Sequence, residues 1–311
     1  MLTHYNHELN FKNDVVFKYV LSNDKDQDSL FLLDLIITHL IGLDYSSLKV
    51  LNPDINPNTL NDKDIVLDIL VEDNSGNKMN VEMQQSNLST YLYQRFQFYG
   101  AKILTTQLNE GDSYRLLRPV YQVIFIDDIN IAHPCLKEVY TSKNDDGIEE
   151  RCNLIHRIYI FLPYINEIKK ERGLETFTPL EKMIYIFANS IDDDIMEVEE
   201  KVVKVMEKKL EAFTKEESLA YLAFQRYMGK WQAHMEREEL KEQALREKER
   251  GLQEGTQVGK RITIFHLIQM KYPNESLSFL DKCNSEQLDI IENHIFDDIT
   301  FTELKEFIEK K

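Results

Sequence analysis

The sequence has few cysteines, and their placement excludes cysteine-based sites. Cys135, Cys152 and Cys283 are odd in number and lie far apart in a chain of 311 residues. Neither a disulfide framework nor a zinc site built on cysteines is therefore expected. The eight histidines show no metal-ligand spacing, so we interpret them as structural. A reducing cytoplasm is the expected setting.

Long apolar runs and a secretion signal are also lacking. No segment approaches the roughly 18 apolar residues that a membrane-spanning helix needs. The opening residues, MLTHYNHELNFKND, lack the basic and apolar blocks of a signal peptide. The 42% hydrophobic and 29% charged residues are ordinary for a globular protein, and the length allows one large domain or two modest ones. We expect no membrane partner.

Positive charge is scarce, with 37 Lys and Arg against 54 Asp and Glu and a net charge of -17. An acidic chain repels nucleic acid at long range, because phosphate binding depends on cationic side chains that displace counterions. The uneven distribution weakens this objection. One stretch has more cations than acids: Arg95, Lys102, Arg115 and Arg118 against Glu110 and Asp112. A bound metal ion would add local positive charge.

The hydrophobic pattern predicts an α/β core over residues 1–190. The expected helices cover residues 29–43, 90–108 and 179–188, and the expected strands cover residues 48–51, 64–72, 78–85, 120–127, 136–141 and 154–161. The strands 64–72 and 78–85 flank a turn that contains Gly76, so they should pair antiparallel. On the first of them, the apolar residues Ile65, Leu67, Ile69 and Val71 should share one face.

The second part, residues 191–311, is predicted to be helical. Residues 236–250 carry almost no apolar stripe, which indicates a solvated helix or a weak coiled coil. Gly251, Gly255 and Gly259 then recur at every fourth position. They indicate either a flexible break or a helix face that lets a partner pack closely.

Residues 261–311 are predicted to form a small helical unit, after a charged helix or linker over residues 191–260. Two capping boxes are expected there, Asn284 with Gln287 and Thr300 with Glu303. Each pairs a helix-start side chain with a Gln or Glu three residues later.

Three polar residues interrupt the predicted hairpin. Asp68 lies near the middle of its predicted strand, and Glu82 and Gln84 leave the same face of the returning strand. The hairpin should place Asp68 and Glu82 within reach of each other. Neighbouring carboxylates repel unless one is protonated or a cation lies between them, and Mg²⁺ prefers such oxygen ligands. On spacing alone, a metal site and an ordinary solvent-facing hairpin remain alternatives.

Several short motifs, in this order and spacing, resemble one family. They are FKNDVVFK at residues 11–18, LDIL at 67–70, VEMQ at 81–84, RFQFY at 95–99 and LRPVY at 117–121. Together they resemble the recombination-promoting nuclease and transposase family (Rpn) of the PD-(D/E)XK superfamily, over most of residues 5–190. The resemblance implies a restriction-endonuclease-like core with a mixed central sheet, followed by an α-helical C-terminal region.

The resemblance also implies an activity. We expect a bacterial, Mg²⁺- or Mn²⁺-dependent DNA endonuclease, linked to recombination, transposition or mobile elements. Asp68 and Glu82 resemble the metal ligands of the family, with the backbone carbonyl of Met83 as a third. Gln84 stands where the superfamily usually has a lysine, so it could orient water or phosphate only by hydrogen bonds. Asp14 resembles an upstream acid of the site, and an N-cap on the first helix is the alternative.

Arg95, Tyr99 and Lys102 recur at helical spacing and form a predicted phosphate-binding face. An ordinary helix with tyrosines on the sheet and charges in solvent is the alternative. For the chain as a whole, two other functions remain open: a catalytically weak interaction protein with a nuclease fold, and a nuclease that acts on RNA. The charged C-terminal helices also suggest a homodimer.

Overall fold

The computed structural model describes residues 10–55, 65–85, 90–129, 134–198, 200–297 and 299–309, without the side chains of residues 253, 254 and 309. The chain divides into two compact units, Met1–Gly229 and Lys230–Lys311. Helix α8 begins in the first unit and ends in the second. Within the described residues, no helix is both long enough and apolar enough to cross a bilayer.

The first unit is built on a mixed six-stranded sheet in the order β1-β4-β5-β6-β8-β7. Strands β5, β6 and β8 are parallel, whereas β1, β4 and β7 pair antiparallel with their neighbours. A separate pair is formed by β2 and β3. The strands are β1 (Leu48–Leu51), β2 (Asp54–Ile55), β3 (Ile65–Val66), β4 (Ile69–Asp73), β5 (Lys78–Gln84), β6 (Val120–Ile126), β7 (Lys137–Tyr140) and β8 (Ile155–Phe161).

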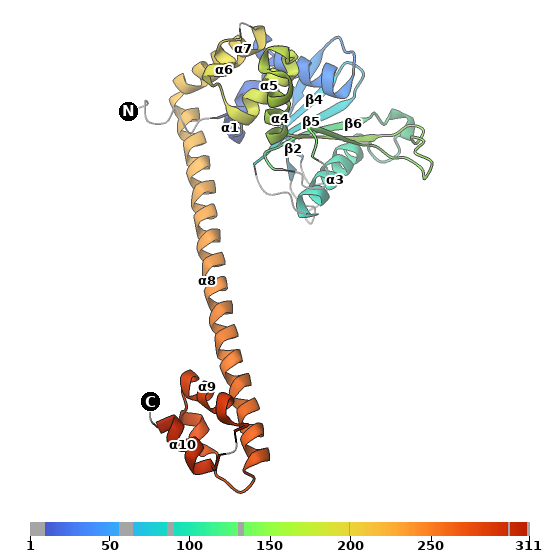
Figure 1. Ribbon diagram of the computed structural model, residues 1–311. Coiled ribbons are helices and arrows are strands. Elements are labelled where there is room, and N and C mark those ends of the chain that lie inside the picture. The colour runs from blue at the N-terminus through green and yellow to red at the C-terminus, as the bar shows by residue number, and fades with distance from the viewer. Residues whose placement is uncertain are drawn as a thin grey trace. The chain divides into compact units, whose positions relative to one another are not determined.

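Helices cover both faces of the sheet, as Figure 1 shows. One face packs on α1, α2 and α5, with α7 packed on these helices, and the other face packs on α3. Both faces of the central strands are therefore buried, which explains the nearly continuous hydrophobic run of β6. The helices are α1 (Asp14–Leu21), α2 (Gln27–Ile36), α3 (Thr90–Thr105), α4 (Ile165–Arg172), α5 (Pro179–Asn189), α6 (Asp193–Met196), α7 (Lys201–Lys215), α8 (Glu217–Lys271), α9 (Ser285–His294) and α10 (Phe301–Glu309). Short helical turns follow α2 at Ile37–Ile41 and β8 at Leu162–Tyr164.

The predicted strand over residues 64–72 is interrupted in the structure. It splits into β3 and β4 with a bend at Asp68, and β3 pairs with β2 instead of continuing the main sheet. The bend moves Ile65 and Leu67 into the cluster under α3, whereas Ile69 stays in the main core. The expectation of one shared apolar face was therefore wrong, and Asp68 lies at a strand end instead of mid-strand. Residue 64 is outside the described residues.

The first unit extends beyond residue 190, where the sequence analysis placed the end of the core. Helix α7 buries Val202, Met206 and Phe213 in the main core. Its buried Lys209 donates to the Asp26 carboxylate (2.6 Å) and the Ser29 hydroxyl (2.8 Å) of the α2 region. These contacts explain why the compact unit reaches Gly229.

The second unit has its own apolar core. Residues from the end of α8, from α9 and from α10 form it, including Ile268, Leu288 and Leu304. Both predicted capping boxes are present: the Asn284 and Gln287 side chains bond to each other's backbone N–H groups, and so do those of Thr300 and Glu303.

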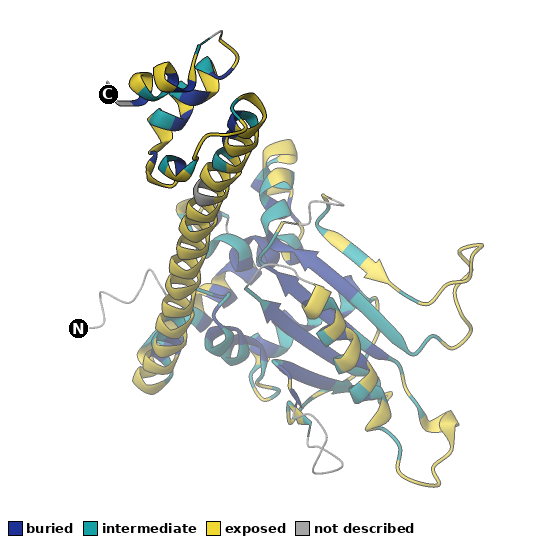
Figure 2. Ribbon diagram, turned by 90° about the horizontal axis from the view of Figure 1, so that it is seen from below, coloured by how far each residue is buried: buried dark blue, intermediate teal, exposed yellow. Residues whose placement is uncertain are grey.

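Helix α8 runs unbroken through the three glycines, so no flexible break is present there. Residues 231–252 and 255–259 are exposed, as the yellow ribbon in Figure 2 shows. Residues 236–250 are therefore helical and exposed in the single chain, which fits both a solvated helix and a weak coiled coil.

Candidate active site

Asp68 and Glu82 meet at the end of the β4–β5 hairpin. The antiparallel register pairs Ile69 with Val81, so the next positions outward bring the two acids opposite each other. The backbone N–H of Asp68 donates to Oε1 of Glu82 (3.2 Å), and Oδ2 of Asp68 accepts from the backbone N–H of Met83 (3.0 Å). These side-chain bonds replace part of the regular ladder, which accounts for the bend at Asp68.

Glu82 is a buried carboxylate, with only 5% of its surface exposed. Burial and, to a lesser degree, the charge of Asp68 raise the pKa of Glu82 to about 8, from an ordinary value of 4.5. The N–H bond from Asp68 and the charge of Arg95 oppose this increase without overcoming it. Two acids held this closely favour a shared proton or a cation between them.

Gln84 lies at the end of β5 and is engaged by α3. The Nη2 atom of Arg95 donates to Oε1 of Gln84 (2.6 Å). The Arg95 guanidinium also lies over the rings of Phe96 and Tyr99, 5.0 and 5.6 Å from their centroids. Arg95 is thereby fixed beside the two acids, with aromatic rings supporting its plane.

The other predicted site residues lie on α1 and α3. Tyr99 is half-buried on α3, and Lys102 follows on the same helix about two turns after Arg95. Asp14 is the first residue of α1, and the cap of that helix is Asn13, whose side chain accepts from the N–H of Val15. Asp14 therefore does not cap the helix.

Lys18 belongs to the centre and was assigned no role from the sequence. Its ammonium lies 3.2 Å from Oδ1 of Asp68. The signal was available, because Lys18 ends the FKNDVVFK motif and lies one helical turn after Asp14. The sequence does not show how α1 packs against the sheet, and it is this packing that brings the Lys18 ammonium to the Asp68 carboxylate.

A row of buried amides continues from the acids under α3. Asn80 and Gln122 are fully buried on neighbouring strands of the same face. Gln122 donates to the carbonyl of Phe96 (2.9 Å), which ties β6 to α3. Among the described residues, Oε1 of Gln122 has no hydrogen-bond partner, whereas the side chain of Asn80 lies beside Glu82 and acts to lower the pKa of that acid. Neither amide is predicted from the sequence, because each interrupts an otherwise apolar strand without a recognisable motif.

The donor set of this centre fits a hard divalent cation. Two carboxylates and the nearby peptide group of Met83 are oxygen-rich, and Mg²⁺ is commonly bound by one or two carboxylates with waters and substrate phosphates. In the described part of the chain, no group of three or more His, Cys, Asp and Glu side chains is arranged around one point. A closed, all-protein metal cage is therefore absent there, while an open site remains compatible with the two acids.

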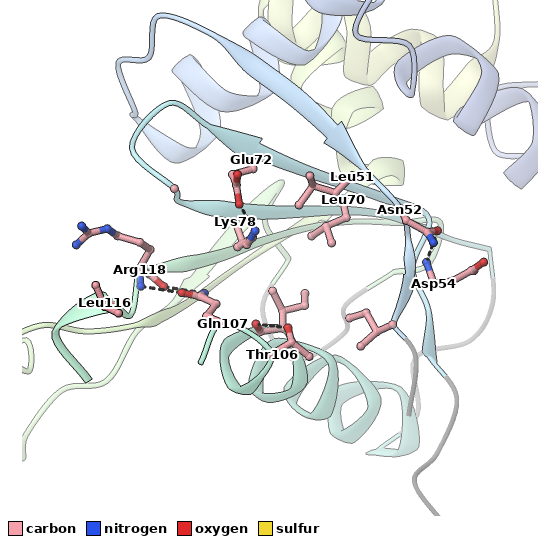
Figure 3. Close-up of a pocket in the computed structure, with 13 residues that line it drawn as sticks. Leu51, Asn52, Asp54, Leu70, Glu72, Lys78, Thr106, Gln107, Leu116 and Arg118 are labelled. Carbon is pink, nitrogen blue, oxygen red and sulfur yellow. Dashed lines mark hydrogen bonds and ion pairs between the residues drawn. The ribbon is translucent and has the colours of Figure 1, made fainter. Parts of the chain in front are cut away.

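A cavity of the first unit lies apart from this centre. It has a volume of about 590 Å³ and opens beside the hairpin turn, where Glu72 pairs with Lys78 (Figure 3). Lys78 is four residues before Glu82, which corresponds to about 13 Å along a strand. Several polar groups that line this cavity bond one another. The Gln107 side chain bonds to the backbone of Arg118, and the Asn52 side chain accepts from the backbone N–H of Asp54. Nothing in this cavity resembles the paired acids.

Comparison with known proteins agrees with this arrangement. No protein of curated function and no solved structure matches the chain significantly. One family model, described as PD-(D/E)XK nuclease family transposase, matches residues 11–244 and so covers the sheet, α3 and every residue of the candidate site. With three quarters of its length matched, the chain belongs to the PD-(D/E)XK nuclease family transposases.

Proposed function

We propose that this chain is a metal-dependent endonuclease that hydrolyses phosphodiester bonds of DNA. Asp68, Glu82 and the carbonyl of Met83 would hold Mg²⁺ or Mn²⁺. The observation that carries the proposal is the contact between the buried Glu82 carboxylate and the N–H of Asp68, a second acid. Burying a carboxylate beside another is costly, and a cation would offset that cost.

The remaining residues have distinct tasks in the proposed reaction. A water oxygen bonds to phosphorus while one P–O ester bond breaks; the water loses a proton and the leaving oxygen gains one. The cation supplies a water of lowered pKa and neutralises charge on the phosphate. Gln84 orients the water or the phosphate by hydrogen bonds, because its amide does not exchange a proton. Asp14 is the upstream acid of the site.

Arg95 is the proposed phosphate-binding residue, with Tyr99 and Lys102 on the same helix. A guanidinium grips phosphate oxygens by paired hydrogen bonds, and such contacts position the substrate without reading its sequence. Its bond to Gln84 supports this role, since a phosphate held by Arg95 would lie beside the proposed metal ligands.

The test compares cleavage of plasmid DNA with Mg²⁺ by the purified chain, by Asp68→Ala and by Glu82→Gln. We expect both variants to cleave at least about 100-fold more slowly. Loss of a residue that only supports a metal ligand costs up to about 100-fold, and loss of a ligand itself should cost at least as much. Glu72→Gln is the matched control, because this carboxylate lies on the same hairpin but bonds to Lys78. Equal cleavage rates for the unmodified chain and for Asp68→Ala would contradict the proposal.

A second candidate is an interaction protein that retains the nuclease fold with little or no activity. The net charge of -17 and Gln84 in place of lysine favour it. Calorimetry separates the two functions: no binding of Mn²⁺ at millimolar concentration supports the interaction protein. DNA and RNA present the same phosphate to the metal, so the site itself does not separate a DNA nuclease from an RNA nuclease. A cleavage assay in which the two substrates compete distinguishes a nuclease that acts on RNA.

We also propose that the chain forms a homodimer through its C-terminal helices and acts on DNA in recombination or transposition in the bacterial cytoplasm. Leu245 and Leu252 are exposed on α8 at 56% and 71%, and lie seven residues apart, so they share one helix face. A second copy could cover this face. Light scattering should give twice the chain mass at micromolar concentration, and a monomer would contradict pairing.

A further inference from the structure

Helix α1 delivers a lysine to the paired acids. The Lys18 ammonium forms an ion pair with Oδ1 of Asp68 at 3.2 Å, while Oδ2 of the same carboxylate accepts from the N–H of Met83. The Lys18 side chain keeps 34% of its surface exposed and that of Asp68 keeps 16%. The ammonium is therefore at the open side of the pair, where solvent and a substrate can reach it.

The position of Lys18 is fixed by its helix. Val16, Phe17 and Val20 are fully buried in the main core. The Nδ2 atom of the capping residue Asn13 donates to the carbonyl of Ala223 (2.9 Å), which ties the start of the helix to α8. A lysine on such an anchored helix loses less freedom on binding than one on a loop.

The strand position next to the acids provides no cation. Gln84 is neutral, and its Oε1 atom is already engaged by Arg95. The Arg95 guanidinium approaches from α3, whereas Lys18 approaches from α1 and contacts the other end of the acid pair. The ammonium of this site therefore comes from Lys18 on α1 and not from a residue of β5.

We propose that Lys18 is the catalytic lysine of this site and supplies the charge that Gln84 does not. Without metal, its ammonium neutralises Asp68. A cation bound to that carboxylate would free the ammonium from its ion pair, and the ammonium would then donate hydrogen bonds to the attacking water or to a non-bridging phosphate oxygen. This inference rests on the proposed nuclease function.

A purely structural ion pair has a different signature. Partly exposed ion pairs contribute little to stability, so a structural Lys18 would affect unfolding slightly and cleavage hardly at all. The removal of one preorganised donor to a transition state instead costs roughly 100- to 1000-fold in rate. Turnover and stability therefore separate the two roles.

The experiment measures single-turnover cleavage of plasmid DNA and Mn²⁺ affinity by calorimetry on the full chain. Lys18→Met keeps most of the side-chain length without charge, and Lys18→Arg keeps the charge. Lys78→Met is the matched control, because Lys78 pairs with Glu72 at the far end of the same hairpin.

We expect Lys18→Met to lose roughly 100-fold in cleavage rate. It should bind Mn²⁺ at least as tightly as the unmodified chain, because the ammonium that competes for Asp68 is gone. Lys18→Arg should recover part of the rate, and Lys78→Met should cleave normally.

Each other outcome counts against the inference. If Lys18→Met cleaves within about threefold of the rate of the unmodified chain, the catalytic role of Lys18 is overturned and the nuclease proposal is not. The reason is that loss of a donor to the transition state should lower the rate far more. Loss of Mn²⁺ binding in Lys18→Met also overturns it, since the lysine would then act only by holding the metal ligand. An unmodified chain that binds Mn²⁺ without cleaving DNA, or Asp68→Ala that cleaves equally, overturns the nuclease proposal and the role of Lys18 with it. Thermal unfolding of Lys18→Met and Lys18→Ala establishes that the measured protein is folded.

Discussion

Glu82 is the residue whose charge depends most on its surroundings. Burial and the neighbouring Asp68 favour its protonated form, while Arg95 and the N–H of Asp68 favour the carboxylate. The balance raises its pKa, so the proposed metal ion would compete with a proton for the same oxygen atoms. The charge of this one side chain thereby links folding to pH.

The metal-free chain should lose stability as pH rises. An acid with a raised pKa binds its proton more tightly when folded than when unfolded. The loss begins as pH passes the ordinary Glu value of 4.5 and is complete above about 8, where both states are ionised. Glu82→Gln stays neutral throughout, so its melting temperature should exceed that of the unmodified chain above about pH 8 and fall less between pH 5 and pH 8.

Calorimetric melting curves with a chelator present measure this difference. Glu72→Gln, on the same hairpin but half-exposed, is the control and should follow the unmodified chain. Parallel pH profiles for Glu82→Gln and the unmodified chain would contradict a buried ionisable Glu82.

The contact between Gln84 and Arg95 makes a second prediction at this scale. Gln84→Lys would place an ammonium against the guanidinium that now bonds the amide at 2.6 Å. The superfamily lysine is therefore incompatible with this Arg95, and the melting temperature should fall by roughly 2–4 °C, the equivalent of about 1 kcal/mol. Gln84→Glu has nearly the same size and should form an ion pair, so its melting temperature should not fall. Equal thermal shifts for the two variants would exclude charge as the cause.

Among the secondary-structure elements, α3 depends on a close approach to the sheet. Gly100 lies on this helix against β6, and a Cβ there would come within 2.5 Å of Oε1 of Gln122 and 3.1 Å of Cγ2 of Ile155. Gln122 is fully buried and holds the carbonyl of Phe96, so it has little room to move. The glycine lets the helix carrying Arg95 settle onto the strand next to β5.

Gly100→Ala should destabilise the first unit by about 1–3 kcal/mol, as overpacking of a core does. Chemical denaturation measures the change, and DNA cleavage should fall with it, because Arg95 is displaced along with α3. Gly229→Ala is the control. It is also helical, a Cβ there meets no atom within 4 Å, and alanine should stabilise its helix by up to about 1 kcal/mol. An unchanged stability for Gly100→Ala would mean that α3 does not pack this closely.

The described residues form apolar cores in both units: the clusters around the mixed sheet in the first unit and one cluster in the second. No residue is common to them. The candidate site belongs entirely to the first, so damage to the second core should leave the chemistry intact if the two units fold independently.

Leu288→Ala tests this independence. Leu288 is 1% exposed in the second core, and its truncation should destabilise that unit by about 2–5 kcal/mol. Hydrogen exchange should show faster exchange in α9 and α10 and unchanged exchange in β5 and β6. Met270→Ala, at 76% exposure, should change stability by less than about 0.5 kcal/mol. Faster exchange in β5 after Leu288→Ala would reveal that the two cores unfold together.

Much of the molecule follows from local sequence. The strands β1, β5, β6, β7 and β8 lie within a residue or two of their predicted positions, because the apolar period and the turn residues determine them. The capping boxes of α9 and α10 are equally local. The five short motifs between residues 11 and 121, taken in their order and spacing, were likewise sufficient to identify the family.

Long-range contacts decided the rest. The break at Asp68 arises from bonds to Glu82 and Met83 on another strand, which no strand pattern contains. The inclusion of α7 in the first unit depends on the buried Lys209, and the approach of Lys18 to Asp68 depends on how α1 packs. The sequence by itself determined which residues form the candidate site's hairpin, since periodicity and turn chemistry act over a few neighbours. Only the tertiary structure decided which cation faces which acid, because residues 50 positions apart meet only when the core has packed.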